Sequence, residues 1–403
     1  MKKFEVSELS AIGPGVRYAR NFSHPATRER AVYLRVLAAI VALALGFAGS
    51  AVLTREVPRP EVEAMRRAAQ RMASAEDAVA NRRQSLGVAI DPTLDPHRTG
   101  LIGIESSILT TTAGDIVAKR TVTSTAFAAL VVRYFHDLGL KPGDSVAVGS
   151  SGSFPGALLA VLAACAEAGV RPVVITSIGA SEFGANIEDL SDAEMMVAAR
   201  DAGVFPYVPA AISPGGDGDR GISSLYRLEP SDDLARYARS LAARLNIPFV
   251  GGSDYEASFA AHLAVYERAA PIAAFINIGG ADINFGSDSA SLTLKPGLIR
   301  PQPPRPQQQQ QQQRARDGAF ARATPNGGAI YGGLLGHYLA AGVPVIHILN
   351  IKGLALQAGI SVDGDPRAPI PSSILNERKI PTWPVGLGLI LACAALAIRK
   401  PLG

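Results

Sequence analysis

The sequence is poor in the side chains that build disulfide frameworks and metal sites. It contains two cysteines and six histidines among 403 residues. Cys165 and Cys393 lie in separate apolar stretches, so we do not expect a disulfide bond between them. No cysteines and histidines stand at the spacing of a metal site. We therefore predict no bound metal, and we predict no cofactor.

Charged residues are also scarce. Asp, Glu, Lys and Arg make up 18% of the chain, and the formal net charge is +4 at pH 7. Proteins that bind nucleic acid usually gather their basic residues in a patch or stripe. Here the basic residues are spread along the whole chain, which argues against a nucleic-acid partner.

Apolar residues are abundant at 48%, and two long apolar runs explain much of this value. They cover residues 36 to 53 and 385 to 398. A membrane-spanning helix needs about 20 largely apolar residues. The second run is short, but Trp383 and the pair Arg399 and Lys400 flank it as expected at membrane interfaces. We predict transmembrane helices over residues 31 to 54 and 381 to 398; the alternatives are a cleaved signal peptide and a buried core helix, respectively.

The basic residues near these runs predict an orientation. Several precede the first run, and Arg399 and Lys400 follow the second, which favours a cytoplasmic location for both ends. Residues 1 to 30 would then form a cytoplasmic arm, and the main domain would lie outside the inner (cytoplasmic) membrane. Arg55 and Arg59 weaken this bias because they stand on the predicted outer side.

The stretch from residue 145 to 165 organises the main domain. It combines a short apolar strand, a glycine- and serine-rich turn, and an Ala/Leu-rich helix that begins at Pro155. The unpaired amides and the dipole at a helix N-terminus attract anions. We therefore predict ligand binding at four turn residues, Gly149, Ser150, Gly152 and Ser153. A turn with a purely structural role is the alternative.

Further short apolar strands are predicted at residues 101 to 104, 171 to 176, 272 to 278 and 344 to 349, with helices between them. This alternation predicts an α/β fold with a doubly wound, mainly parallel, Rossmann-like sheet over residues 98 to 375. Ligands bind such sheets beyond the carboxyl ends of the strands. Polar or glycine residues follow several predicted strands and complete the expected site: Glu105, Ser177, Asn277, Gly279, Gly280, Asn350 and Lys352. Arg220, in a glycine-rich loop, is added as a possible ligand-covering residue.

Two segments flank or interrupt this domain. Residues 55 to 97 are predicted as a stalk helix and linker, although a helix packed on the outer domain fits the same apolar spacing. Residues 286 to 326 contain a Pro/Gln-rich tract that cannot bury a core, and we predict a disordered insertion there.

Several motifs together resemble the poly-gamma-glutamate system protein family. They are TGLIGIESS (99–107), TTT (110–112), AKRT (118–121), VAVGSSGSFPG (146–156), SIGASEFGAN (177–186), GGDGDRG (215–221), NIGG (277–280) and HILN (347–350). The resemblance covers about residues 60 to 375. It implies a membrane component of poly-gamma-glutamate synthesis or export, and it supplies no catalytic residue.

Three functions are compatible with these residues. A binding protein would receive the polymer carboxylates on the 149–156 turn and on lysine and arginine side chains, including Lys119. A gamma-glutamyl hydrolase or transferase would use Ser151 as nucleophile and Glu105 as general acid or base, although the G-x-S-x-G spacing is absent. A scaffold would use its Ala/Gly-rich spans to pack against the synthase membrane subunits.

Overall fold

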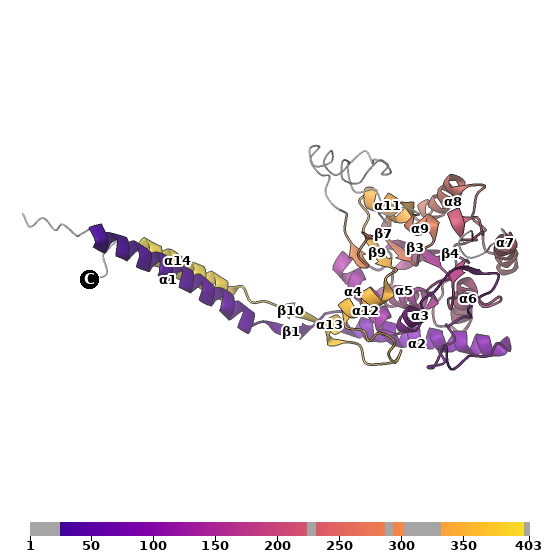
Figure 1. The fold of residues 1–403 in the computed structure, drawn as a ribbon, viewed down its shortest axis with the longest axis horizontal. Coiled ribbons are helices and arrows are strands. Elements are labelled where there is room, and N and C mark those ends of the chain that lie inside the picture. The colour runs from indigo at the N-terminus through magenta and orange to yellow at the C-terminus, as the bar shows by residue number, and fades with distance from the viewer. Residues whose placement is uncertain (1–24, 224–230, 287–292, 302–331, 399–403) are drawn as a thin grey trace, which may run out of the picture. The chain divides into compact units, whose positions relative to one another are not determined.

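The computed structural model describes residues 25 to 223, 231 to 286, 293 to 301 and 332 to 398. The chain divides into two compact units, Met1–Val57 with Arg378–Gly403, and Pro58–Glu377. Most of the predicted cytoplasmic arm and the Pro/Gln tract lie outside the described residues. The first unit contains helices α1 and α14, and the second contains an α/β domain (Figure 1).

In the first unit, α1 (Pro25–Val52) and α14 (Trp383–Ala397) run side by side in opposite directions (Figure 1). Their inward residues are small, with Ala39, Gly46 and Ser50 buried on α1, and Gly388 and Ala392 buried on α14. Large apolar side chains such as Leu37 and Ile390 point outward and are exposed. This helix pair therefore has small residues inside and large apolar residues outside.

The segment Glu29–Val52 of α1 is long and apolar enough to cross a membrane, with a mean hydropathy of 2.2. This confirms the coarse prediction of one N-terminal apolar helix; a signal sequence meets the same criterion. Helix α14 has 15 residues and falls short of that length.

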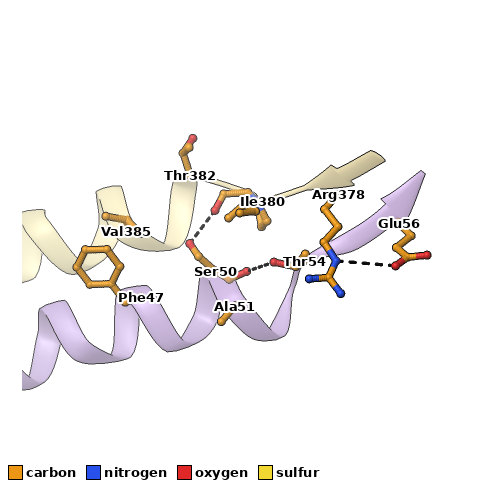
Figure 2. Close-up of a pocket in the computed structure, with 10 residues that line it drawn as sticks. Phe47, Ser50, Ala51, Thr54, Glu56, Arg378, Ile380, Thr382 and Val385 are labelled. Carbon is orange, nitrogen blue, oxygen red and sulfur yellow. Dashed lines mark hydrogen bonds and ion pairs between the residues drawn. The ribbon is translucent and has the colours of Figure 1, made fainter. Parts of the chain in front are cut away.

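A hydrogen bond joins α1 to the segment that precedes α14, near residues 50 and 381 (Figure 2). The Ser50 hydroxyl donates to the Pro381 carbonyl at 2.7 Å, and the Thr54 hydroxyl donates to the Ser50 carbonyl at 2.9 Å. Beyond them, β1 (Arg55–Pro58) pairs with β10 (Asn376–Lys379). Arg378 Nε lies 3.8 Å from Glu56 Oε1, and Figure 2 marks this ion pair. Ser50, Thr54, Glu56, Arg378 and Pro381 are among the residues that line a cavity of about 760 Å³.

The second unit is built on a six-stranded sheet in the order β6-β4-β3-β7-β9-β8. All neighbouring strands are parallel except β8 and β9, which are antiparallel. The strands are β3 (Ser145–Ser151), β4 (Arg171–Ser177), β6 (Ala211–Ser213), β7 (Ile272–Ile278), β8 (Gly297–Ile299) and β9 (Val345–Ile348). A second, two-stranded parallel sheet pairs β2 (Thr110–Thr112) with β5 (Ala180–Ser181).

Helices cover both faces of the six-stranded sheet (Figure 1). On β3, Val146 and Val148 join a core formed with α2, α4 and α5, whereas Ala147 joins a second core formed with α8 and α11. Successive side chains of a strand point to opposite faces, and both faces here are apolar, as expected for a buried parallel sheet. The predicted α/β class with a mainly parallel sheet is confirmed.

The helices begin and end at recognisable signals. Helix α5 begins at a proline, α6 carries a capping box of Ser191 and Glu194, and α4 and α5 end at Gly139 and Gly169 in left-handed conformation. The helices of this unit are α2 (Val62–Ser85), α3 (Ile116–Thr121), α4 (Ala126–Leu138), α5 (Pro155–Ala168), α6 (Asp192–Asp201), α7 (Asp233–Leu245), α8 (Tyr255–Glu267), α9 (Asp282–Phe285), α11 (Gly333–Ala340), α12 (Ile351–Ala358) and α13 (Ser372–Leu375).

Three sequence predictions need correction. Residues 101 to 104 do not form a strand, because side chains bind their backbone groups in place of a neighbouring strand. Arg83 donates to the carbonyls of Gly100 and Ile102, and the Asn186 amide pairs with both backbone groups of Ile104. Helix α2 belongs to the α/β unit and buries its apolar stripe there, so the alternative of a packing helix replaces the stalk. The range 286 to 326 includes β8, which pairs with β9.

Candidate functional site

A cavity of about 250 Å³ opens at the carboxyl ends of β3 and β7, beside Ser151 and Gly280. In the sheet, β4 and β6 lie on one side of β3, and the later strands β7 and β9 lie on its other side. In parallel α/β sheets, a ligand crevice forms where the chain order reverses in this way. The lining residues are Thr111, Thr112, Ala113, Gly114, Asp115, Lys119, Ser151, Ser153, Phe154, Gly179, Ser181, Gly216, Asp217, Gly280, Ala281, Asp282 and Leu349.

One wall of the cavity is formed by Lys119 and its contacts. Helix α3 carries this lysine, and the Asp115 side chain caps that helix by accepting from the Val117 and Ala118 amides. Lys119 is only 2% exposed, and its Nζ donates to the Ser153 carbonyl and to the Ser181 hydroxyl. The amine also lies 4.2 Å from the Phe154 ring centroid. Burial lowers the pKa of Lys119 to about 7, although Asp115 and Glu182 act in the opposite direction.

Serine residues form the part of the cavity wall next to Lys119. The Ser181 amide donates to the Ser153 hydroxyl at 3.1 Å, and the Ser153 amide approaches the Ser151 hydroxyl at 3.4 Å. Gly279, after β7, has a φ of +81°, and a Cβ placed there would lie 2.1 Å from the Ser151 Oγ. Only glycine therefore leaves room for the Ser151 hydroxyl at this position.

Carboxylates form another part of the wall. Asp217 begins the short helix η1 (Asp217–Asp219), and Asp282 begins α9. The Gly218 amide donates to Asp282 Oδ2 at 2.9 Å. Burial raises the pKa of Asp282, and the nearby charge of Asp217 raises it further. The cavity therefore combines a lysine and hydroxyl groups with a pair of acidic side chains.

A buried polar chain supports the loop that carries Asp217. The Ser177 and Ser213 hydroxyls lie 2.8 Å apart, and Ser213 donates to Asp219 Oδ1 at 2.8 Å. Behind them, His262 Nδ1 is 2.8 Å from the Ser258 carbonyl and 3.8 Å from Asp219 Oδ2. Burial raises the pKa of Asp219, and the nearby His262 opposes that rise. These hydrogen bonds hold the loop in place from the interior of the protein, and the residues that form them do not line the cavity.

The structure brings together some of the sequence-predicted residues. Ser151, Ser153 and Gly280 line the cavity, and Gly279 packs directly against Ser151. Glu105 is exposed and lies outside the lining. The predicted catalytic pair of Ser151 and Glu105 therefore does not share this cavity.

The glycines of the 149–156 turn have a packing role. A Cβ at Gly149 would meet the Asn284 side chain at 2.3 Å, and one at Gly152 would meet the Ala180 Cβ at 2.9 Å. A Cβ at Gly156 would lie 2.6 Å from the Val122 carbonyl oxygen. These glycines let the chain approach itself closely. The Ser150 side chain is fully buried, with its hydroxyl 3.4 Å from Asp192 Oδ2.

Asn277 and Asn350, two further predicted residues, form hydrogen bonds that stabilise the backbone near the site. Asn277 is buried, and its amide donates to the Gly279 carbonyl at 2.9 Å and lies 3.0 Å from His347 Nδ1. Asn350 caps α12 by accepting from the Gly353 amide at 3.0 Å. Ser177 has the buried position described above. All three therefore support the site without lining the cavity.

The two predicted cations are placed differently from the prediction. Lys352 forms an ion pair with Asp115, so a lining carboxylate already balances its charge. Arg220 is exposed, with its Nε 3.5 Å from the Asp217 carbonyl oxygen. Neither side chain lines the cavity, where Lys119 is the cation among the described lining residues.

Histidine is the most common general base in enzymes, but none is among the described residues that line the cavity. His347 is buried against the Phe285 ring, and burial lowers its pKa to about 4, so it is a neutral core residue. His136 approaches Glu61, and His337 contacts the Phe259 ring. Within the described part of the chain, no histidine hydrogen-bonds to a serine of the cavity.

Sequence reasoning missed the contact between Lys119 and Ser181 and the role of Asp217 and Asp282 in the lining. Ser181 comes a few residues after β4. A polar residue near the end of a strand is the same pattern that predicts Ser177 as a site residue. No local signal places Lys119 beside Ser181, because the two residues are 62 positions apart.

Comparisons with family models, with curated proteins and with solved structures return no match to this chain.

Proposed function

We propose that this protein is a membrane-anchored component of poly-gamma-glutamate synthesis or export, and that its cavity binds the amino end of a gamma-glutamyl chain. The family resemblance of the motifs suggests the system. The observation that carries the proposal is the presence of Lys119 and Ser181 in the same cavity as Asp217 and Asp282.

The charges of the cavity favour a chain end over the middle of the polymer. A residue inside the polymer offers a carboxylate and amides, and it would meet the repulsion of Asp217 and Asp282. The terminal residue offers an ammonium group as well as its carboxylate. The ammonium suits the two aspartates, and the carboxylate suits the serine hydroxyls, because charge-assisted hydrogen bonds are about twice as strong as neutral ones.

The proposed arrangement places a doubly wound, Rossmann-like domain outside the inner (cytoplasmic) membrane, with α1 and α14 as an antiparallel pair of spans. Small inward residues and large exposed apolar residues on both helices support this assignment. Helix α14 is about 22 Å long at 1.5 Å per residue, so the bilayer would have to thin around it or flanking residues would have to extend to the interface.

The orientation can be tested with exposed cysteines introduced into a Cys393→Ala background, where the remaining Cys165 is buried. A membrane-impermeant maleimide should label Lys141→Cys, on the surface of the α/β domain, in intact spheroplasts. Ser10→Cys should react only after the cells are lysed. The reverse pattern would contradict the proposed location.

Ligand binding can be measured by titration calorimetry of the full chain in detergent. We expect a short gamma-linked glutamate oligomer with a free amino end to bind at least tenfold more tightly than its N-acetylated form. Asp282→Asn should abolish this preference, whereas Asp201→Asn, an exposed change on α6, should not. Equal affinity for the two oligomers would contradict recognition of the chain end, and binding of neither would contradict polymer binding.

A scaffold for the synthase membrane subunits is a second candidate, favoured by the large exposed apolar side chains of α1 and α14. The small residues expected to contact such partners are already used between α1 and α14. If export survives deletion of the α/β domain and is lost without the helices, the scaffold function is the correct one.

A further inference from the structure

We propose that Ser181 and Lys119 act as nucleophile and general base in cleaving gamma-glutamyl amide bonds. This inference rests on the proposed function for its substrate class, and it replaces the pair of Ser151 and Glu105 that the sequence suggested. Serine and lysine form such pairs in hydrolases of unrelated folds.

The geometry of the two side chains supports this role. Lys119 Nζ lies within hydrogen-bonding distance of the Ser181 Oγ, and both residues line the cavity. Ser181 is held by the pairing of β5 with β2 and by the hydrogen bond from its amide to the Ser153 hydroxyl. Lys119 is held by the Ser153 carbonyl and the Phe154 ring. Both reacting groups therefore sit on supported elements, as catalysis requires.

The lysine also has a suitable proton affinity. Burial lowers the pKa of Lys119 to about 7, so about half of its amines are neutral near that pH and available to accept a proton. Asp115 and Glu182 oppose this shift, and Asp115 is itself paired with Lys352. The Ser151 hydroxyl has no comparable base, since no lysine or histidine of the described residues hydrogen-bonds to it.

The reaction balances with water as the only co-reactant. Neutral Lys119 takes the proton of the Ser181 hydroxyl while Oγ attacks the gamma-carbonyl carbon. The tetrahedral oxyanion collapses, the C–N bond breaks, and the Lys119 ammonium gives its proton to the leaving amine. Water then attacks the gamma-glutamyl ester, Lys119 accepts a proton from this water, and Ser181 is released with its proton restored. An amine in place of water would give transfer.

The position of the aspartates suggests which bond is cut. With the terminal ammonium group beside Asp217 and Asp282, the gamma-carbonyl of that same residue would face Ser181. The ester intermediate would then carry one glutamyl residue, and the rest of the polymer would leave as the amine. The activity is therefore expected to shorten chains from the amino end, one residue at a time.

A fluorophosphonate probe tests the nucleophile directly in the full-length protein in detergent. We expect mass spectrometry to find the phosphonyl group on Ser181, and the labelling rate to rise with pH through about 7 as Lys119 loses its proton. Lys119→Met should slow labelling at least 100-fold, and Lys119→Arg should do the same because arginine stays protonated.

The exposed variants Lys141→Met and Ser85→Ala serve as matched controls and should be labelled at the wild-type rate. The inference would be overturned if the probe labelled Ser151 instead, if Ser181 carried no label, or if Lys119→Met were labelled at the wild-type rate.

A second variant keeps the test decisive if Lys119→Met does not fold. In Ser181→Cys, the rate of alkylation by iodoacetamide reports the pKa of the new thiol. A thiol that shares a proton with Lys119 should titrate well below the ordinary cysteine value of about 8.5. A thiol pKa at or above that value would contradict the proposed pair.

The two proposals can fail separately. Incubation with the free-ended oligomer should release glutamate from the wild type, while Ser181→Ala should bind the oligomer and leave it intact. Binding without cleavage by the wild type would overturn the Ser181 and Lys119 inference and leave polymer binding standing. Absence of binding would overturn the proposed function, even if Ser181 reacts with the phosphonate.

Discussion

Gly46 of α1 and Gly388 of α14 face each other with almost no space between the two helices. A Cβ placed on Gly388 would lie 3.2 Å from the Gly46 Cα and 2.6 Å from the Ala42 carbonyl oxygen. Such close approach through small residues is a common packing mode of membrane helices, where the hydrophobic effect does not drive association.

Replacing Gly388 with leucine should push the two helices apart. Interaxial distances in helix pairs vary between roughly 8 and 10 Å with the side chains at the contact, so we expect a separation on the order of 2 Å. The change can be measured by electron spin resonance between nitroxide labels at the exposed positions Leu34 and Leu396, with Cys393 replaced by alanine. Gly386→Leu is the matched control, because a Cβ there meets nothing within 4 Å. Equal label distances in both variants would contradict the packing of α1 against α14.

Asp192 should make stability depend on pH. Burial raises the pKa of this carboxyl from 3.8 to about 8, despite hydrogen bonds from the Ala193 amide and the Ser150 hydroxyl. The folded state therefore holds a proton that the unfolded state releases between these pH values, and stability falls as the pH rises through this range. When the folded and unfolded pKa values differ by one, the free energy of unfolding changes by about 1.4 kcal/mol. Relative to Asp192→Asn, the wild type should lose a few kcal/mol between pH 5 and pH 9 in urea unfolding.

The control for this experiment is Asp201→Asn at the exposed end of the same helix, which should change stability equally at both pH values. Parallel pH profiles for wild type and Asp192→Asn would mean that the Asp192 carboxyl is ionised in the folded protein.

Gly279→Ala should destabilise the α/β unit more than Gly139→Ala does. Both glycines have left-handed φ values, +81° and +71°, which cost an alanine roughly 1–2 kcal/mol. At Gly279 the new methyl group would also collide with the Ser151 hydroxyl, and overpacking typically adds about 1–3 kcal/mol. At Gly139 a Cβ meets nothing within 4 Å. Urea unfolding of the two variants compares these costs, and similar losses would show that the space beside Ser151 is not constrained.

Much of the fold can be predicted from the sequence because it follows from local patterns. Short apolar runs such as residues 272 to 278 form strands at the expected places, and Gly139 and Gly169 end their helices. The edge of the sheet where polar residues gather is likewise a consequence of parallel strand order. The apolar run at residues 101 to 104 misleads, because its backbone partners are the distant side chains of Arg83 and Asn186.

The site is less predictable because its members come from separate segments. Ser151 and Gly280 can be identified from the sequence, since Ser151 ends one strand and Gly280 comes shortly after another. The contact of Lys119 with Ser181 joins residues that are 62 positions apart, and no local pattern encodes it. The glycines at 149 and 152 suggested an open anion site, yet Asn284 and Ala180 fill the space beside them. Glycine content alone does not distinguish room for a ligand from room for the chain itself.

We propose that the cavity between Lys119 and Asp282 holds a gamma-glutamyl chain end. A crystal structure of Ser181→Ala soaked with a short, free-ended gamma-linked glutamate oligomer tests it most directly. We expect density in the cavity, with a carboxylate within hydrogen-bonding distance of a serine hydroxyl and the terminal ammonium beside Asp217 and Asp282. An empty cavity at saturating oligomer, or an oligomer bound on another surface of the protein, would contradict it.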